Sequence, residues 1–221
     1  MDPTTQQSKL LKHHLSLVIA YNEQLNLTRI VSPDQAHILH IEDSLAGVDA
    51  ITRAPEGPLV DLGSGAGYPG IPLAIMLERN VTLVESVAKK AQALTSMVET
   101  LELDWVDVFT GRAEELALQK AGEYSVVTAR ALTQLPSLLE LASPLLAPHG
   151  WLCAYKAEDI EEELEHACSI ARKLGMSYCE TVHLTLSDNT PRTLVVFEKQ
   201  HEPEVKLPRR AGMAQKRPYR A

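Results

Sequence analysis

Cysteine, aromatic residues and long apolar runs are all scarce in this chain of 221 residues. The three cysteines, Cys153, Cys168 and Cys179, are odd in number and lack metal-ligand spacing, which argues against a disulfide framework and predicts no metal site. No apolar run approaches the length of a membrane span, and residues 1–14 lack the apolar core of a signal peptide. We therefore expect a cytoplasmic protein with one substantial core and no membrane partner.

Positive charge is also in short supply. The chain has 21 basic and 29 acidic residues and a net charge of −8, which taken alone argues against nucleic acid as a partner. From Lys206 onward, however, there are six basic residues and no acid, which leaves 15 basic against 29 acidic residues, or −14, for the remainder. The charge is therefore strongly polarised toward the C-terminal tail.

The composition of this tail fits contact with phosphates and unpaired bases of RNA. Pro208, Gly212 and Pro218 are expected to keep the tail from forming a helix, and Tyr219 is available to stack. The tail residues that we expect to bind RNA are Arg209, Arg210, Lys216 and Arg217. The alternative is a solubilising or disordered tail without a ligand.

The most informative segment is 59–70, an apolar strand followed by a glycine-rich turn. Asp61 stands just before Gly63, and Gly65 and Gly67 follow at every second position. The dinucleotide fingerprint G-x-G-x-x-G places its third glycine one residue later, and an acid at the mouth of the loop would repel a pyrophosphate. Asp61 can instead receive the ammonium end of a methionine moiety or hold the loop amides. The segment favours S-adenosyl-L-methionine over a dinucleotide, the alternative being an ordinary tight turn.

A second acid, Glu85, ends the next predicted strand, 81–85. A carboxylate at this place can accept hydrogen bonds from both hydroxyls of a ribose, in nucleotide-binding and adenosylmethionine-binding sheets alike. Glu85 therefore supports a cofactor site without choosing between the two cofactors. Its alternative is a solvated strand end.

Strand and helix patterns alternate along most of the chain. They follow an amphipathic helix over about 7–27 and a second helix that opens at Ser32-Pro33 and continues toward Gly47. Strands are predicted at 59–62, 81–85, 105–110, 125–128, 151–155, 178–186 and 192–198. Helices are predicted at 68–77, 89–101, near Glu114, at 135–146 and at 159–174.

This pattern predicts an α/β fold with a mostly parallel, Rossmann-like sheet that ends in a C-terminal antiparallel hairpin. That is the architecture of class I methyltransferases. We expect one domain, in which 1–52 form an N-terminal helical cap, 58–200 the Rossmann-like core and 201–221 the basic tail.

An ordered set of short motifs extends over nearly the whole chain. They are Asn26-Leu27-Thr28, the segments 40–45 and 61–73, Glu85-Ser86, Lys89-Lys90, Arg112-Ala113-Glu114, Arg130-Ala131 and Tyr155-Lys156. Together they resemble the bacterial RsmG/GidB family of small-subunit ribosomal RNA methyltransferases. The resemblance implies an S-adenosylmethionine-dependent enzyme that methylates guanine N7 in 16S rRNA, either free or within a small ribosomal subunit precursor.

The resemblance also implies a set of site residues. Those lining the cofactor pocket would be Gly63, Tyr68, Ala113, Glu114 and Arg130. The adenine would lie near Ala113 and Glu114, and the methionine end near Gly63. Each position follows a predicted strand, at the edge of the sheet where open α/β folds bind ligands. A surface ion pair between Arg112 and Glu114 is the alternative.

The turn after the fourth predicted strand, 128–131, lacks the Asp/Asn-Pro-Pro-aromatic sequence of amine-methylating enzymes. Guanine N7 needs no such acceptor, because no proton must leave before its in-plane lone pair attacks. Positioning of the guanine against the methyl group then dominates catalysis, and the methyl group is transferred in line. Since no general base is needed, His40 and Cys153 are expected to have no catalytic role. A bidentate contact of Arg130 with guanine O6 and N7 would occupy the N7 lone pair that must attack the methyl group. Arg130 is therefore expected to touch the cofactor, guanine O6 alone or a phosphate.

Lys156 is expected to hold an RNA phosphate beside the fifth strand, and an ion pair is the alternative both for it and for Arg130. Four residues of the cap either shape the RNA entrance or fasten the cap to the sheet: Arg29, His37, His40 and Asp43. Truncation before Lys206 is expected to weaken RNA binding and to leave cofactor affinity nearly intact.

Two alternative functions remain. One is a small-molecule methyltransferase, and the other is a non-catalytic assembly factor that the cofactor stabilises.

Overall fold

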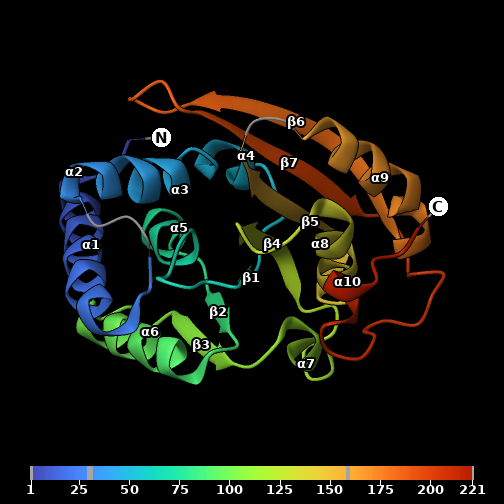
Figure 1. Cartoon of the computed structure of the whole chain (residues 1–221), viewed down its shortest axis with the longest axis horizontal. Coiled ribbons are helices and arrows are strands. Elements are labelled where there is room, and N and C mark those ends of the chain that lie inside the picture. The colour runs from blue at the N-terminus through green and yellow to red at the C-terminus, as the bar shows by residue number, and fades with distance from the viewer. Residues whose placement is uncertain (1, 29–31, 158–159, 221) are drawn as a thin grey trace.

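A seven-stranded sheet forms the centre of the computed structural model, which describes residues 2–28, 32–157 and 160–220 (Figure 1). The strands run in the order β3-β2-β1-β4-β5-β7-β6. Their bounds are β1 (Leu59–Leu62), β2 (Val81–Glu85), β3 (Val106–Thr110), β4 (Tyr124–Arg130), β5 (Leu146–Lys156), β6 (Met176–Thr185) and β7 (Pro191–Lys199). The first five are parallel, and β7 runs antiparallel to both β5 and β6. The predicted parallel sheet with a closing hairpin is confirmed.

The strand order reverses at β1, which lies between β2 and β4. Leu62 at the end of β1 is in register with Val84 on one side and Ala129 on the other. Parallel strands that diverge from such a point leave a crevice outside their carboxyl ends, where open α/β folds bind ligands. The ends of β1, β2 and β4, with Glu85 and Arg130, therefore meet at one edge of the sheet.

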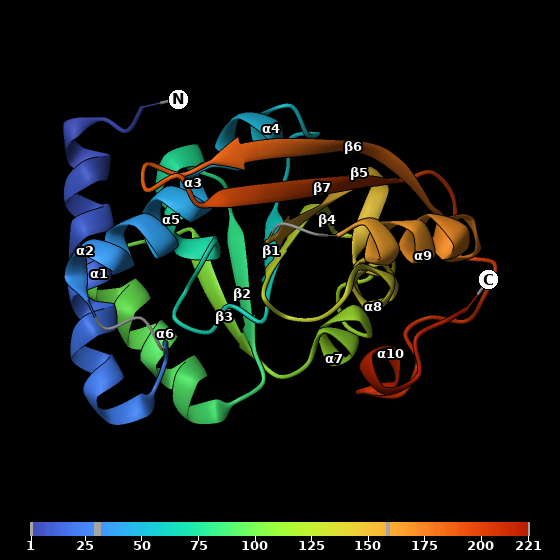
Figure 2. The same ribbon diagram turned by 45° about the horizontal axis from the view of Figure 1, so that its top comes forward.

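Helices cover both faces of the sheet, and each layer buries its own apolar cluster. One layer contains α1 (Thr5–Leu25), α4 (Val48–Thr52), α5 (Gly70–Leu77) and α6 (Ala88–Thr100). The other contains α7 (Ala113–Ala117), α8 (Leu135–Ala142), α9 (Glu161–Ala171), a 3-10 turn (Arg172–Leu174) and α10 (Met213–Lys216). Figure 2 shows α1 and α6 at one end of the molecule and α8, α9 and α10 at the other. Asp159, the predicted start of the helix at 159–174, lies outside the described residues.

The second half of the cap is less regular than the single helix that the sequence predicts. It consists of α2 (Pro33–Ala36), a π-helical segment (His37–Glu42) and α3 (Asp43–Leu45). A π segment adds a residue to the helical turn and is frequent at functional sites. This one presents His40 toward the end of β4, as α3 does its first residue, Asp43.

Close contacts fasten the cap to the sheet. The hydroxyl of Tyr155, on β5, donates to the Ser44 carbonyl at 2.9 Å. A Cβ at Gly47 would lie 2.2 Å from that hydroxyl, so only glycine permits this approach. At the tip of the β6–β7 hairpin, the Ser187 hydroxyl donates to Glu42 at 3.0 Å. The cap therefore contacts the core both at β5 and at the β6–β7 hairpin.

The basic tail is folded, and the expectation that proline and glycine keep it from helix is wrong. Helix α10 forms within it, and Ala214 is buried against α8. The Ala214 carbonyl accepts a hydrogen bond from the Ser137 hydroxyl at 2.8 Å, and the Tyr219 carbonyl accepts one from His166 at 2.9 Å. Figure 1 shows α10 and the C-terminus beside α8 and α9. Tertiary contacts at α8 and α9 thus hold a segment whose local sequence does not favour helix.

Candidate functional site

The glycine-rich turn between β1 and α5 has the backbone geometry that its sequence predicts. Gly63, Gly65 and Gly67 have φ angles of +71°, +56° and +91°, in the region that side chains with a Cβ rarely adopt. A Cβ at Gly63 would lie 2.7 Å from the Leu132 side chain, whereas the nearest atom to a Cβ at Gly65 is a carbonyl oxygen 3.8 Å away. The main chain at Gly65 therefore faces open space, where a ligand can approach it closely.

Asp61 is fully buried beneath this turn. Its carboxylate accepts a hydrogen bond from the Thr128 hydroxyl at 2.8 Å and one from the Gly70 amide at 3.3 Å. Burial raises the pKa of the carboxyl to about 6. Of the two roles considered for Asp61, holding the loop amides is the one visible here, so it acts on the site through the loop.

Glu85 is nearly buried at the end of β2. One carboxylate oxygen accepts from the Gly65 amide at 3.2 Å, and the other accepts from the Val87 amide at 2.8 Å. Each oxygen of a carboxylate can accept a second hydrogen bond. Glu85 thus orders the glycine-rich turn while keeping the capacity to bind a ligand hydroxyl.

Two cavities meet at Gly63, which lines both. The larger cavity, of about 590 Å³, lies between the cap and the ends of β1, β4 and β5. Its lining includes Thr28, His40, Asp43, Gly65, Tyr68, Arg130, Lys156 and Arg192. The smaller cavity, of about 250 Å³, lies at the start of α7, and its lining includes Val84, Ser86, Gly111, Ala113, Glu114, Leu132 and Gln215. A ligand that crosses Gly63 would occupy both.

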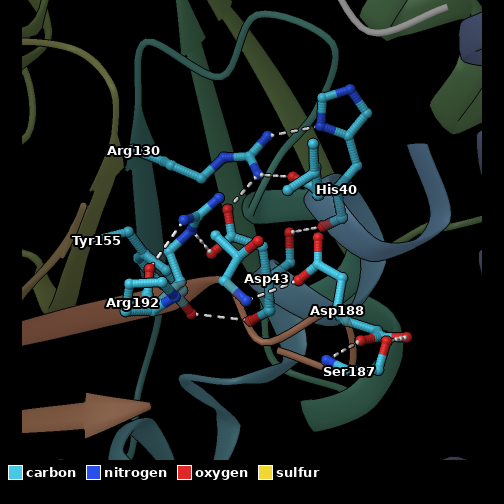
Figure 3. A network of polar contacts seen from close by, with 12 residues as sticks. His40, Asp43, Arg130, Tyr155, Ser187, Asp188 and Arg192 are labelled. Carbon is cyan, nitrogen blue, oxygen red and sulfur yellow. Dashed lines mark hydrogen bonds and ion pairs between the residues drawn. The ribbon is translucent and has the colours of Figure 1, made fainter. Parts of the chain in front are cut away.

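Arg130 joins the end of β4 to the cap (Figure 3). Its guanidinium donates to the Asp43 carboxylate and to the Leu39 carbonyl, each at 2.8 Å, and to His40 Nδ1 at 3.1 Å. The second oxygen of Asp43 accepts from Arg192 Nε at 3.0 Å. The ion pair considered as the alternative for Arg130 is therefore present, and it lies in the wall of the larger cavity.

His40 is neutral in this arrangement. Its Nδ1 accepts from Arg130, so its Nε2 carries the proton and donates to the Thr28 hydroxyl at 2.9 Å. Burial, assisted by the Arg130 charge, lowers the pKa of His40 to about 4. The ring stacks on Tyr68 with centroids 4.5 Å apart. These contacts give His40 a structural role between Arg130, Thr28 and Tyr68.

His14 supports the site from behind Tyr68, and sequence reasoning missed it. Its ring packs against Tyr68 at 4.6 Å, its Nε2 lies 3.0 Å from the Ala66 carbonyl, and burial lowers its pKa to about 3. The Tyr68 hydroxyl is buried without a hydrogen-bond partner among the described residues, and burial raises its pKa. A signal for His14 was available, because it shares the buried face of α1 with Leu11 and Val18.

Lys156 and Cys153, both on β5, serve the fold. Lys156 forms an ion pair with Glu163 of α9 and donates to the Thr133 carbonyl at 2.9 Å. The ion pair considered as its alternative is therefore present, in place of a lysine held ready for a phosphate. The Cys153 thiol is fully buried, which raises its pKa to about 12 and leaves it inert as a nucleophile.

Glu114 lines the smaller cavity together with Ala113, and its hydrogen-bond partner comes from the tail. One carboxylate oxygen of this buried residue accepts from the Gly212 amide at 2.6 Å, in place of the surface ion pair with Arg112. Gln215 of α10 lines the same cavity. The tail therefore reaches the smaller cavity, a contact that the sequence does not predict.

The described residues were also considered as ligands of a metal ion and as spans of a membrane. Across 2–28, 32–157 and 160–220, no group of three or more His, Cys, Asp or Glu side chains is placed to hold a metal ion. No helix in these ranges combines the length and the apolar character needed to cross a bilayer.

Solved structures share the fold of this chain at low sequence identity. An O-methyltransferase from Bacillus cereus, solved in complex with SAH, is 23% identical with a TM-score of 0.59, over 84% of this chain and 90% of that one. TYW2 from M. jannaschii, in complex with AdoMet, is 18% identical with a TM-score of 0.53, over 75% and 78%. These likenesses confirm the methyltransferase type of α/β fold.

Sequence relatives are much closer. A relative from Streptococcus suis (strain 05ZYH33), named ribosomal RNA small subunit methyltransferase G, is 37% identical over 97% of this chain and 92% of its own length. The protein of that name from Streptococcus sanguinis (strain SK36) is 36% identical over the same shares. The family model described as rRNA small subunit methyltransferase G matches residues 7–193. The resemblance seen in the motifs is confirmed, and the chain belongs to the rRNA small subunit methyltransferase G family.

Proposed function

We propose that this protein transfers a methyl group from S-adenosyl-L-methionine to N7 of a guanine in 16S ribosomal RNA, which the resemblance to the family suggests is guanine 527. The observation that carries the proposal is the open main chain at Gly65, at the point where the sheet order reverses and two cavities meet. A ligand with an adenosine end and a methionine end fits such a pair of cavities. Family membership supplies the ribosomal RNA.

The adenosine end belongs in the smaller cavity, beside Ala113 and Glu114, and the methionine end belongs beside Gly63 and the glycine-rich turn. Glu85 would accept hydrogen bonds from the ribose hydroxyls through the carboxylate lone pairs that the Gly65 and Val87 amides do not use. This cofactor supplies an electrophilic methyl group on a sulfonium, so the attacking lone pair of N7 forms the new bond as the carbon–sulfur bond breaks.

The larger cavity is the place for the guanine. Three of the five guanidinium N–H groups of Arg130 donate to the cap, so two remain for guanine O6 or a phosphate. His40 is neutral and already hydrogen-bonded on both ring nitrogens. Positioning without a general base is the chemistry that this wall supports.

The tail contributes cations to RNA binding, but fewer than its composition implies. Arg209 is committed to the buried Glu140 of α8, with bonds of 2.6 and 2.5 Å. Arg210, Lys216 and Arg217 are exposed and stay in the proposed RNA contact. Lys156 is not part of the proposed RNA contact, because Glu163 neutralises the charge of its ammonium group.

The direct test is methyl transfer to unmodified 16S RNA and to small subunits, mapped at nucleotide resolution. We expect S-adenosylmethionine-dependent methylation at one guanine N7, since one cavity positions one base. Methylation of an exocyclic amine would contradict the proposed chemistry. Turnover of small molecules only would favour a small-molecule enzyme, and cofactor binding without any transfer would favour an assembly factor.

Replacing Glu85 with alanine is expected to weaken cofactor binding by about 1.5–3 kcal/mol, because charge-assisted hydrogen bonds to the ribose are lost and the Gly65 amide loses its acceptor. Calorimetric titration with S-adenosylmethionine measures the change. Glu99→Ala, an exposed carboxylate on α6, is the control and should bind as the wild type does. A folded Glu85→Ala protein with wild-type affinity would remove Glu85 from the ribose site.

A further inference from the structure

The C-terminal segment reaches the smaller cavity from a distant part of the sequence. The rest of the lining comes from residues 62–141, near the ends of β1, β2 and β3 and from α7 and α8, whereas Gln215 comes from α10. Gln215 is also exposed, which places its side chain at the rim of the cavity. The tail thus supplies part of the wall of a site that the core alone leaves open.

A buried hydrogen bond fixes the start of α10 at this wall. The Gly212 amide donates to Glu114 at 2.6 Å, and Glu114 itself lines the cavity. Gly212 has a φ of +80°, in the left-handed region that favours glycine, although a Cβ at this position would meet no atom within 4 Å. The backbone conformation at Gly212 therefore serves to bring its amide to the carboxylate.

A second contact anchors the tail on α8. Arg209 donates two hydrogen bonds to Glu140, whose side chain is only 3% exposed, and these bonds raise the pKa of Arg209. The guanidinium also lies 4.2 Å from the centre of the Tyr219 ring. A buried carboxylate without its partner is costly, so the docked position of the tail is strongly favoured over a detached one.

We propose that residues 209–219 form a wall of the adenosine subsite and that Gln215 binds the edge of the adenine. The carboxamide has a donor and an acceptor side by side, which matches the amino group and the ring nitrogen that adenine presents. The inference rests on the proposed function, in which the smaller cavity holds the adenosine end. It gives the tail a role in cofactor binding in addition to its proposed contact with RNA.

Calorimetric titration of the full-length protein with S-adenosylmethionine tests the contact. We expect Gln215→Ala to bind about three- to tenfold more weakly than the wild type, since it loses the hydrogen bonds of one exposed side chain. Gln200→Ala removes an exposed glutamine outside the cavity lining and should bind as the wild type does. The same ratio is expected with 5′-methylthioadenosine, a probe without the amino-acid end, because the contact is to the base.

A truncation after Pro208 tests the wall as a whole. It is combined with Glu140→Gln, so that the loss of Arg209 does not leave a charged carboxylate buried in α8. We expect a loss of more than tenfold in affinity for S-adenosylmethionine, with the far-ultraviolet circular dichroism of a folded core. Wild-type affinity in the truncated protein would contradict the proposal that the tail forms a wall of the subsite. Wild-type affinity in Gln215→Ala would contradict the proposed contact with adenine. If the wild type binds neither probe, the cofactor assignment itself fails and this inference with it.

Discussion

Replacing Arg130 with alanine is expected to lower the rate of methyl transfer at least about 100-fold and the free energy of unfolding by about 2–4 kcal/mol. The guanidinium holds Asp43, the Leu39 carbonyl and His40, all in the cap, from the end of β4. Its loss leaves the buried Asp43 with Arg192 as its remaining cation. The wall of the larger cavity would shift, and small displacements of a positioning wall are costly to the rate.

The two effects of Arg130→Ala are measured separately. Urea denaturation gives stability, and single-turnover transfer to unmodified 16S RNA, under conditions where the variant is folded, gives the rate. Arg130→Lys should rescue little, because one ammonium cannot reach three acceptors that lie in different directions. Arg53→Ala, which removes an exposed ion pair with Glu180, should change neither quantity appreciably. An unchanged single-turnover rate in folded Arg130→Ala would make this arginine a purely structural link.

The sheet and the glycine-rich turn could be predicted because their signals are local. The strand β2 is a run of apolar and β-branched residues, and the turn after β1 needs glycines where φ is positive. The parallel direction of β1 to β5 then follows from the alternation of strands and helices. These features place Gly63, Gly65 and Glu85 at one edge of the sheet before any tertiary contact is known.

The partners of the charged residues could not be predicted in the same way. Arg130 pairs with Asp43, 87 positions away, and Arg209 pairs with Glu140, 69 positions away. The local sequence of each arginine gives no sign of its partner, so it identifies neither the anchor of the tail nor the carboxylate that pairs with Arg130. The π-helical segment was also missed, because the apolar spacing of residues 37–42 fits an α-helix as well.

Replacing Asp61 with asparagine is expected to remove one contribution to the stability of the wild type, a contribution that falls by about 3 kcal/mol between about pH 4 and pH 6. His14 and His40, whose pKa values burial lowers, contribute in the opposite direction to both proteins. Burial raises the pKa of this carboxyl from 3.8 to about 6 in the folded protein. The folded state therefore binds the proton more tightly than the unfolded chain does. The stability that this gives is fully present below pH 4 and is lost as the pH rises through about 6.

Urea denaturation of wild type and Asp61→Asn from pH 4 to pH 7 measures this linkage. The hydrogen bonds that asparagine alters at Gly70 and Thr128 shift the variant by an amount that does not depend on pH, so the difference between the two curves isolates Asp61. Thr128→Val provides a second test. The Thr128 hydroxyl bond lowers the pKa of Asp61, so its removal should move the fall to higher pH. Parallel curves for wild type and Asp61→Asn would show that the carboxylate is already solvated or paired in the folded protein, and its role beneath the glycine-rich turn would have to be reassigned.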